Sequence, residues 1–126
     1  MRLDGLQLPE ELIWADEFDW SGIFASTKRT IAGKFIVQEV QAPSDAGRII
    51  TLTSDDAWAE RTVLIALQEM SRDLGRQLFL EMNDGRTFLC RFRHWDIPVM
   101  SSEMVLPTAF PEDVTNYKLS LKLAVI

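Results

Sequence analysis

Apolar and polar residues alternate with a period of two along much of the chain, the pattern of half-buried β-strands. Alternating or β-branched runs cover residues 27–40, 48–53, 78–82, 88–92 and 117–125. Asn83, Asp84 and Gly85 separate two of these runs. An Asp-Gly pair in that position predicts a tight β-hairpin, because glycine accepts the positive φ that such turns require.

One segment changes to a helical period. The apolar residues that follow the i, i+4, i+7 spacing of one helical face are Ala59, Val63, Ala66, Leu67, Met70 and Leu74. This spacing predicts one amphipathic α-helix over about residues 55–74. Ser54, Asp55 and Asp56 stand where an N-cap and dipole-compensating acids belong, and Gly75 suits the left-handed position beyond the last turn.

The order of strands, one helix, a hairpin and a final strand predicts an α+β fold that is mostly β. We expect an antiparallel β-sandwich or small barrel flanked by the one helix. The length of 126 residues is typical of a single domain, so residues 1–126 are expected to form one. Residues 95–115 contain three prolines and are expected to form a connecting loop with extended pieces.

The first 24 residues follow neither period, and we interpret them as an extended arm with short turns. Residues 1–20 contain six acidic residues against Arg2 alone, a net charge of −5 out of −6 for the chain. An arm with aromatic residues such as Trp14 and Trp20 must lie on a surface. The sequence leaves open whether that surface is its own domain or another subunit. Asp16 and Glu17 are either solvated or docked on a basic surface of a neighbouring copy.

Three arginines project from the predicted hairpin and form a local basic stripe on an acidic protein: Arg86, Arg91 and Arg93. The stripe is either a solvated strand face paired with Glu81 across the hairpin, or a contact to an acidic neighbour such as the arm of another copy. The candidate interface therefore comprises Trp14, Asp16, Glu17, Trp20, Arg86, Arg91 and Arg93.

Groups suited to catalysis are few. His94 is the only histidine and Cys90 the only cysteine. A pair of His94 with Asp96 is conceivable, but a structural histidine at the strand end is the favoured interpretation. Cys90 shares a strand face with Phe88 and Phe92, which predicts a buried, inert thiol. One cysteine and one histidine are too few for the usual zinc sites. We therefore expect no enzymatic activity, cofactor, metal or small-molecule ligand.

The net charge of −6 and pI near 4.7 disfavour nucleic acid as a partner, because phosphate binding needs a surplus of Lys and Arg. No run of 18 apolar residues is present, so no membrane span is expected. The start lacks the apolar core of a signal peptide, and a single cysteine suits a reducing compartment. These features predict a cytoplasmic protein.

Three runs resemble small tail proteins encoded by phages and prophages: GRIITLTSDDAWAERTVLIALQEM, LFLEMNDGRTFLCRFRH and YKLSLKLAVI. The opening L-x-L-P-x-x-L-x-W-x-D element at residues 6–16 belongs to the same resemblance. Its strongest marks are Gly47-Arg48, Trp58, the DGR at 84–86 and the FRH at 92–94. The order of elements is also similar to the fold of tail-tube and distal-tail proteins, which are arrayed in rings.

The resemblance implies a structural protein of the baseplate or distal tail that acts through subunit contacts. Its implied partners are further copies of itself, in a homo-oligomeric ring, and other tail proteins. It also implies synthesis in the cytoplasm of a bacterial host and a final location in the virion tail. The alternative is a small intracellular protein-binding module or a tail-assembly chaperone. Distal-tail proteins often carry an additional carbohydrate-binding domain, for which this chain has no room.

Overall fold

The computed structural model describes residues 1–54 and 58–126. These residues form eleven strands and one helix, which confirms the expected α+β, mostly β fold. In chain order they are β1 (Arg2–Leu3), β2 (Leu6–Gln7), β3 (Ile13–Trp14), β4 (Ile23–Arg29), β5 (Phe35–Gln41), β6 (Ile49–Thr53), β7 (Ala59–Glu60), α1 (Arg61–Ser71), β8 (Leu78–Glu81), β9 (Thr87–Phe92), β10 (Met100–Met104) and β11 (Asn116–Val125).

The final strand β11 is the centre of the main sheet. The sheet runs β2-β1-β8-β9-β11-β6-β3, and β7 and β10 also pair with β11. Every pairing is antiparallel. Leu121 pairs with both β10 and β6, and Leu123 with both β6 and β9. Thus β9 and β10 follow one another along one edge of β11, with β6 on the other. The predicted strand over residues 117–125 is confirmed.

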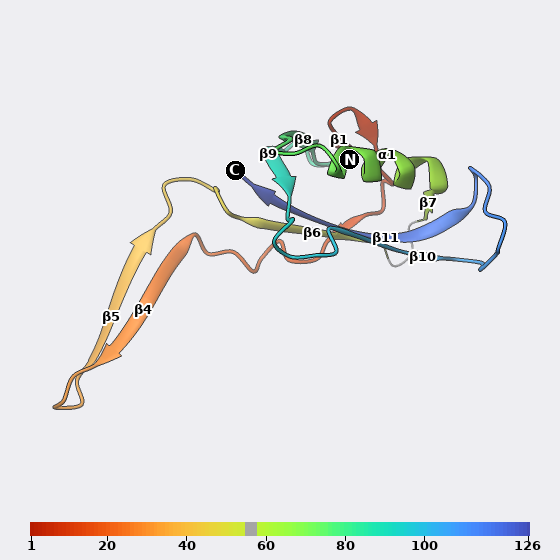
Figure 1. The fold of residues 1–126 in the computed structure, drawn as a ribbon. Helices are drawn as coiled ribbons and strands as arrows, with labels where there is room; N and C mark the ends of the chain where they lie inside the picture. The colour runs from red at the N-terminus through yellow and green to blue at the C-terminus, as the bar shows by residue number, and fades with distance from the viewer. Residues whose placement is uncertain (55–57) are drawn as a thin grey trace.

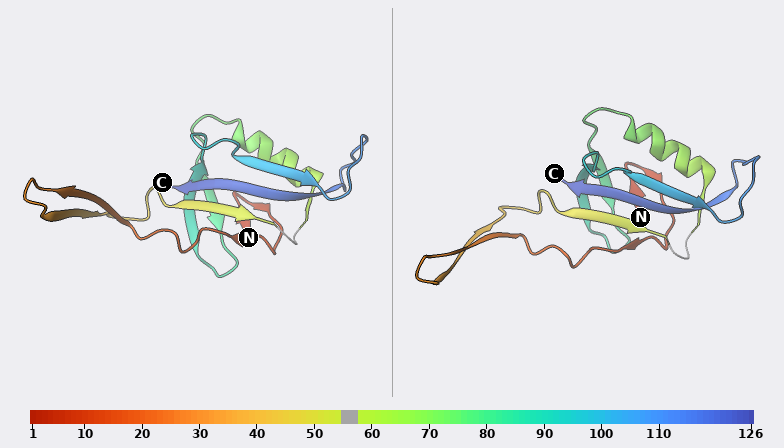
Figure 2. Two further views of the ribbon diagram at one scale, coloured as in Figure 1. Left: turned by 90° about the horizontal axis from the view of Figure 1, so that it is seen from below. Right: turned by 60° about the horizontal axis from the view of Figure 1, so that its bottom comes forward.

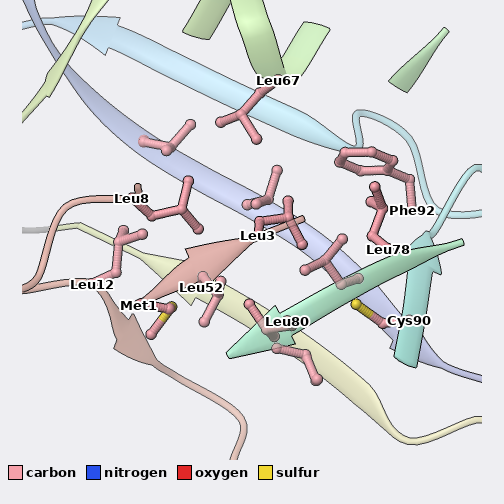
Figure 3. Close-up of a cluster of buried hydrophobic side chains, with 14 of the residues drawn as sticks. Met1, Leu3, Leu8, Leu12, Leu52, Leu67, Leu78, Leu80, Cys90 and Phe92 are labelled. Atoms are coloured by element: carbon pink, nitrogen blue, oxygen red, sulfur yellow. The ribbon is translucent and has the colours of Figure 1, made fainter. Parts of the chain in front are cut away.

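The sheet and the helix enclose one apolar core. β6, β11 and β10 form one layer, and α1, β1, β8 and β9 lie on the same side of it (Figure 1). Leu64 and Leu67 of α1 are buried, as are Leu119, Leu121 and Leu123 of β11. Figure 3 shows side chains from the helix, the sheet and the N-terminal segment meeting in this cluster.

The predicted hairpin over residues 78–92 is confirmed. β8 pairs with β9 from Leu78 opposite Cys90 to Glu81 opposite Thr87. The turn between them contains Gly85 with a φ of 91°, the left-handed conformation that favours glycine. Leu78, Leu80 and Cys90 are fully buried, so the alternation in the sequence identified the correct core face.

The N-terminal segment packs on its own domain. Met1, Leu3, Leu8, Leu12 and Trp14 are buried in the core, and β1 and β3 pair with β8 and β6. Residues 1–14 are therefore part of the folded body, which is the first of the two alternatives left open for the expected arm. Strands of two residues are too short to show a period, so the sequence pattern did not reveal them.

The helix is shorter than the predicted range of 55–74. It begins at Arg61 and ends at Ser71, because Ala59 and Glu60 form β7, which pairs with Tyr117 and Asn116. Ser54 is not its N-cap: the Ser54 hydroxyl accepts from the backbone N–H of Leu119 at 2.7 Å, in the buried sheet. Asp55 and Asp56, the other proposed capping residues, lie outside the described residues. Gly75 has the expected positive φ of 69°.

Residues 27–40, predicted as β structure, fall within a separate hairpin. β4 and β5 form a two-stranded sheet of their own. This hairpin extends away from the body in all three views (Figures 1 and 2). In residues 95–115 the expected extended piece is β10.

Candidate interaction site

The projecting hairpin, residues 23–41, is paired in register from Ile23 opposite Gln41 to Arg29 opposite Phe35. Among the described strands, β4 and β5 bond only to each other. Seven residues at about 3.3 Å each give the hairpin a reach of about 23 Å. It is therefore an arm-like element, in a different place from the arm expected over residues 1–24.

Both faces of the hairpin are exposed. All seven residues of β4 are exposed, and in β5 only Ile36 is partly covered. Its exposed large apolar side chains are Ile23, Phe24, Ile31, Phe35, Val37 and Val40. A two-stranded hairpin alone is marginally stable in water, and clustered exposed apolar residues are typical of interaction surfaces. This hairpin therefore has the properties of an element that a partner covers.

Local contacts shape the base of the hairpin. The backbone N–H of Ala42 donates to the carbonyl of Gly22 at 2.7 Å, which closes the base. The Trp20 ring lies edge-on to Phe24, with centroids 5.8 Å apart. Trp20 is thus the one member of the predicted interface that the structure places beside the projecting hairpin.

The tip of the hairpin has a defined turn. The Thr30 backbone N–H donates to the carbonyl of Lys34 at 2.9 Å, and Gly33 has a φ of 84°. The Arg29 guanidinium lies over the Phe35 ring at 5.2 Å from its centroid. Ile31, between these residues, is fully exposed. The turn therefore presents one large apolar side chain at its apex.

The hairpin is basic although the protein is acidic. Residues 23–41 contain Lys28, Arg29 and Lys34 against Glu39 alone, a net charge of +2 in a chain of −6. None of these three cations forms an ion pair with another residue in the described part of the chain. Their charge is therefore directed at the surroundings rather than neutralised within the fold.

A second unusual surface lies in the loop between β10 and β11. A cavity of about 480 Å³, which we term the Trp58 pocket, is lined by Trp58, residues 105–108 and residues 114–116. Trp58 is 54% exposed and Leu106 80% exposed. This loop lies at the end of the molecule opposite the projecting hairpin (Figures 1 and 2).

The loop that lines the Trp58 pocket is acidic. Residues 105–116 contain Glu112 and Asp113 and no Lys or Arg. Both acids are exposed, and neither forms an ion pair with a described residue. The Thr115 hydroxyl accepts from the Glu112 backbone N–H at 2.8 Å and so fixes the acidic turn beside the pocket.

Several predicted interface residues are instead joined in a cluster within the chain. The Asp16 carboxylate is buried and accepts from Trp14 Nε1 and from the backbone and hydroxyl of Thr51, each at 2.8 Å. Arg93 is only 5% exposed, and its guanidinium donates to Thr51 Oγ1 at 2.5 Å. It also pairs with Asp96 at 3.5 Å. Arg93 is therefore bound within the chain, although its Nε is buried with no hydrogen-bond partner in the described residues, and it is no part of an exposed stripe.

Arg86 joins the N-terminal segment to the β8–β9 turn. Its guanidinium pairs with Glu17 and with Asp84 at 2.6 Å each and lies over Trp14, 5.3 Å from the ring centroid. The hydrogen bond to Glu17 raises the pKa of Arg86, and the Arg86 backbone N–H lowers the pKa of Asp84. Arg48 covers another part of the Trp14 ring at 4.6 Å. The acidic segment and the basic residues thus meet within one chain.

The arginine stripe does not form as a unit. Arg91 is half-buried, Arg93 is buried and Arg86 is engaged by Glu17. The expected pairing with Glu81 is not found among the described residues, because Glu81 stands opposite Thr87 on β9. Strand β9 ends at Phe92, so Arg93 no longer follows the alternation that would have exposed it.

Cys90, His94 and Asp96, the residues considered for chemistry, form no side-chain hydrogen bond or ion pair with one another in the described part of the chain. Cys90 is fully buried, and burial raises the pKa of its thiol to about 12. His94 is exposed at the end of β9, its ring 6.1 Å from that of Phe92. Asp96 pairs with Lys122 at 3.2 Å as well as with Arg93. Within residues 1–54 and 58–126, no group of three His, Cys, Asp or Glu side chains is placed to hold a metal ion. No helix in the same residues is long and apolar enough to cross a membrane.

Comparison of the chain with known protein families, curated proteins and solved structures found no match. The function is therefore inferred from the residues and their arrangement. One feature of the sequence indicated the projecting hairpin. Phe35, Ile36 and Val37 place large apolar side chains on both faces of a strand, close to the three cations Lys28, Arg29 and Lys34. That pattern is compatible with a core strand, so the sequence alone did not place it outside the body.

Proposed function

We propose that this chain is a non-enzymatic structural and assembly protein of a phage or prophage tail, a component of the baseplate or distal tail that acts through contacts between subunits. The observation that carries the proposal is the projecting hairpin, residues 23–41, which exposes apolar side chains on both faces outside the core. The assignment to a tail draws on the sequence resemblance described above.

The geometry of the hairpin suits an assembling subunit. A ring or tube requires heterologous contacts, in which one surface of a subunit meets a different surface of the next. An element that reaches about 23 Å beyond the body can make such a contact without disturbing the core. The N–H of Ala42 bonds to the carbonyl of Gly22 and closes the base of the hairpin, and the segment that precedes the hairpin is tied to the sheet through Asp16.

Mass spectrometry of purified particles tests the proposal. In the phage or prophage that encodes the chain, we expect the protein in finished particles at a constant stoichiometry. The variant Ile31→Ser should enter particles poorly, because it removes the apolar apex of the hairpin. Leu74→Ser is the matched control, since Leu74 is equally exposed but lies on the body after α1.

The outcomes separate the structural role from the alternatives. A tail-assembly chaperone or other intracellular binding module would be needed for particle formation yet be missing from finished particles. Complete particles that form without the chain would overturn the proposal altogether. Equal incorporation of Ile31→Ser and Leu74→Ser would remove the hairpin as its basis.

A further inference from the structure

The two ends of the molecule are complementary in shape and polarity. At one end the projecting hairpin presents Ile31 at a convex tip, followed closely by Phe35. At the other end the Trp58 pocket offers a concave apolar surface that includes Leu106. Its volume of about 480 Å³ is within the range of pockets that hold whole ligands, and is ample for one or two side chains.

The two ends are also complementary in charge. The hairpin tip is flanked by Lys28, Arg29 and Lys34, and the loop at the pocket by Glu112 and Asp113. Elsewhere some charges are matched within the chain, as in the pairs of Arg86 with Glu17 and Arg76 with Asp4. The hairpin tip and the pocket loop carry charges of opposite sign that form no ion pair with a described residue, and they lie at opposite ends, as expected where two copies meet.

We propose that the hairpin tip of one copy docks in the Trp58 pocket of the next copy, with Ile31 and Phe35 against Trp58 and Leu106. The basic residues of the tip then lie near Glu112 and Asp113 of the neighbour. This inference rests on the proposed function and identifies the contact through which its subunits assemble. A docked pair still offers one free tip and one free pocket, so the contact repeats until a ring closes or a filament grows.

Disulfide trapping tests which surfaces meet. The variants Ile31→Cys and Leu106→Cys are purified separately, mixed and mildly oxidised. We expect a disulfide-linked heterodimer in the mixture, because the native Cys90 is fully buried and does not compete. Leu74→Cys replaces Leu106→Cys as the control, since Leu74 is fully exposed but lies outside the pocket. Heterodimer formation no faster with Leu106→Cys than with Leu74→Cys would overturn the inference.

A charge exchange tests the electrostatic part. Lys34→Glu and Asp113→Lys should each weaken self-association, measured by sedimentation velocity, by about threefold to tenfold, as expected for one charge pair at an interface rim. The double variant should restore association to within about twofold of the original chain, because it re-forms the pair with reversed sign. A double variant weaker than both single variants would contradict the contact. Unchanged circular dichroism and unfolding midpoints verify that each variant remains folded.

The two proposals fail in different ways. If particles contain the chain and need Ile31, while trapping and charge exchange are negative, the tail role stands and the hairpin contacts a different tail protein. If trapping and charge exchange succeed but particles form without the chain, the docking stands and the tail role is wrong.

Discussion

Asp16 is one of the residues that hold the N-terminal segment on the sheet. Its buried carboxylate accepts hydrogen bonds from Trp14 Nε1, the Thr51 backbone and the Thr51 hydroxyl. Asp16→Ala leaves these donors without a partner, and we expect the free energy of unfolding to fall by about 2–4 kcal/mol. Urea denaturation measures the change. Asp19→Ala, at an exposed acid, is the control and should shift stability by less than about 0.5 kcal/mol. A loss below about 1 kcal/mol for Asp16→Ala would show that water replaces its partners.

Cys90 permits a second prediction at this scale. Burial raises its pKa from 9.0 to about 12, so at neutral pH its thiolate fraction is about 1,000-fold lower than that of an exposed cysteine. We expect a disulfide reagent such as Ellman's reagent to leave the native thiol unmodified and to label it fully in urea. The variant Ile31→Cys serves as an internal comparison and should label at one thiol per native chain. Labelling of both thiols at similar rates would contradict the buried position of Cys90.

At the scale of elements, the sequence predicted the strands in which apolar and polar residues alternate over enough positions to be recognised. The hairpin β8–β9 and the strand β11 alternate over several residues, and Gly85 marks the turn between the first two. The strands β1, β2 and β3 have two residues each and leave no period to detect. Leu3 of β1 and Trp14 of β3 are nonetheless buried, because tertiary pairing rather than local propensity places these strands.

The helix α1 and the candidate site show the limit of local patterns. Apolar Ala59 and Leu74 extended the predicted helix at both ends, but Ala59 pairs with Tyr117 in the sheet and Leu74 is exposed. Of the three arginines considered for contact with an acidic neighbour, Arg86 pairs with the acidic segment, and it does so within one chain, through Glu17. A sequence pattern identifies complementary charges and does not state whether one chain or two bring them together.

Deletion of the projecting hairpin is the prediction at this scale. Residues 23–41 are replaced by two glycines that join Gly22 to Ala42, whose backbones already bond at 2.7 Å. Because the hairpin pairs only with itself among the described strands, we expect the free energy of unfolding in urea to change by less than about 1 kcal/mol. Leu121→Ala, in the centre of the core, is the contrasting control and should lose about 2–5 kcal/mol. A comparable loss on deleting the hairpin would mean that it supports the body.

At the scale of the whole molecule, the two ends carry charges of opposite sign. Arg86 pairs with Glu17 and Asp84 near the β8–β9 turn, while the cations of the hairpin tip and the acids of the loop at the Trp58 pocket form no ion pair with a described residue. The hairpin tip is therefore positively charged and the opposite end negatively charged. This arrangement favours head-to-tail over head-to-head contacts between copies, because two positively charged hairpin tips repel each other.

Salt should therefore weaken self-association without abolishing it. Raising NaCl from 50 to 500 mM shortens the screening length to a few ångströms, and we expect the apparent Kd in sedimentation velocity to rise by about threefold to tenfold. The apolar contact of Ile31 and Phe35 persists at high salt, so association at high protein concentration should remain. Lys34→Glu should show a shallower salt dependence than the original chain, because it has already lost one attractive pair. A Kd that is independent of salt, or that falls as salt rises, would mean that the contact is apolar alone and that the acidic loop lies outside it.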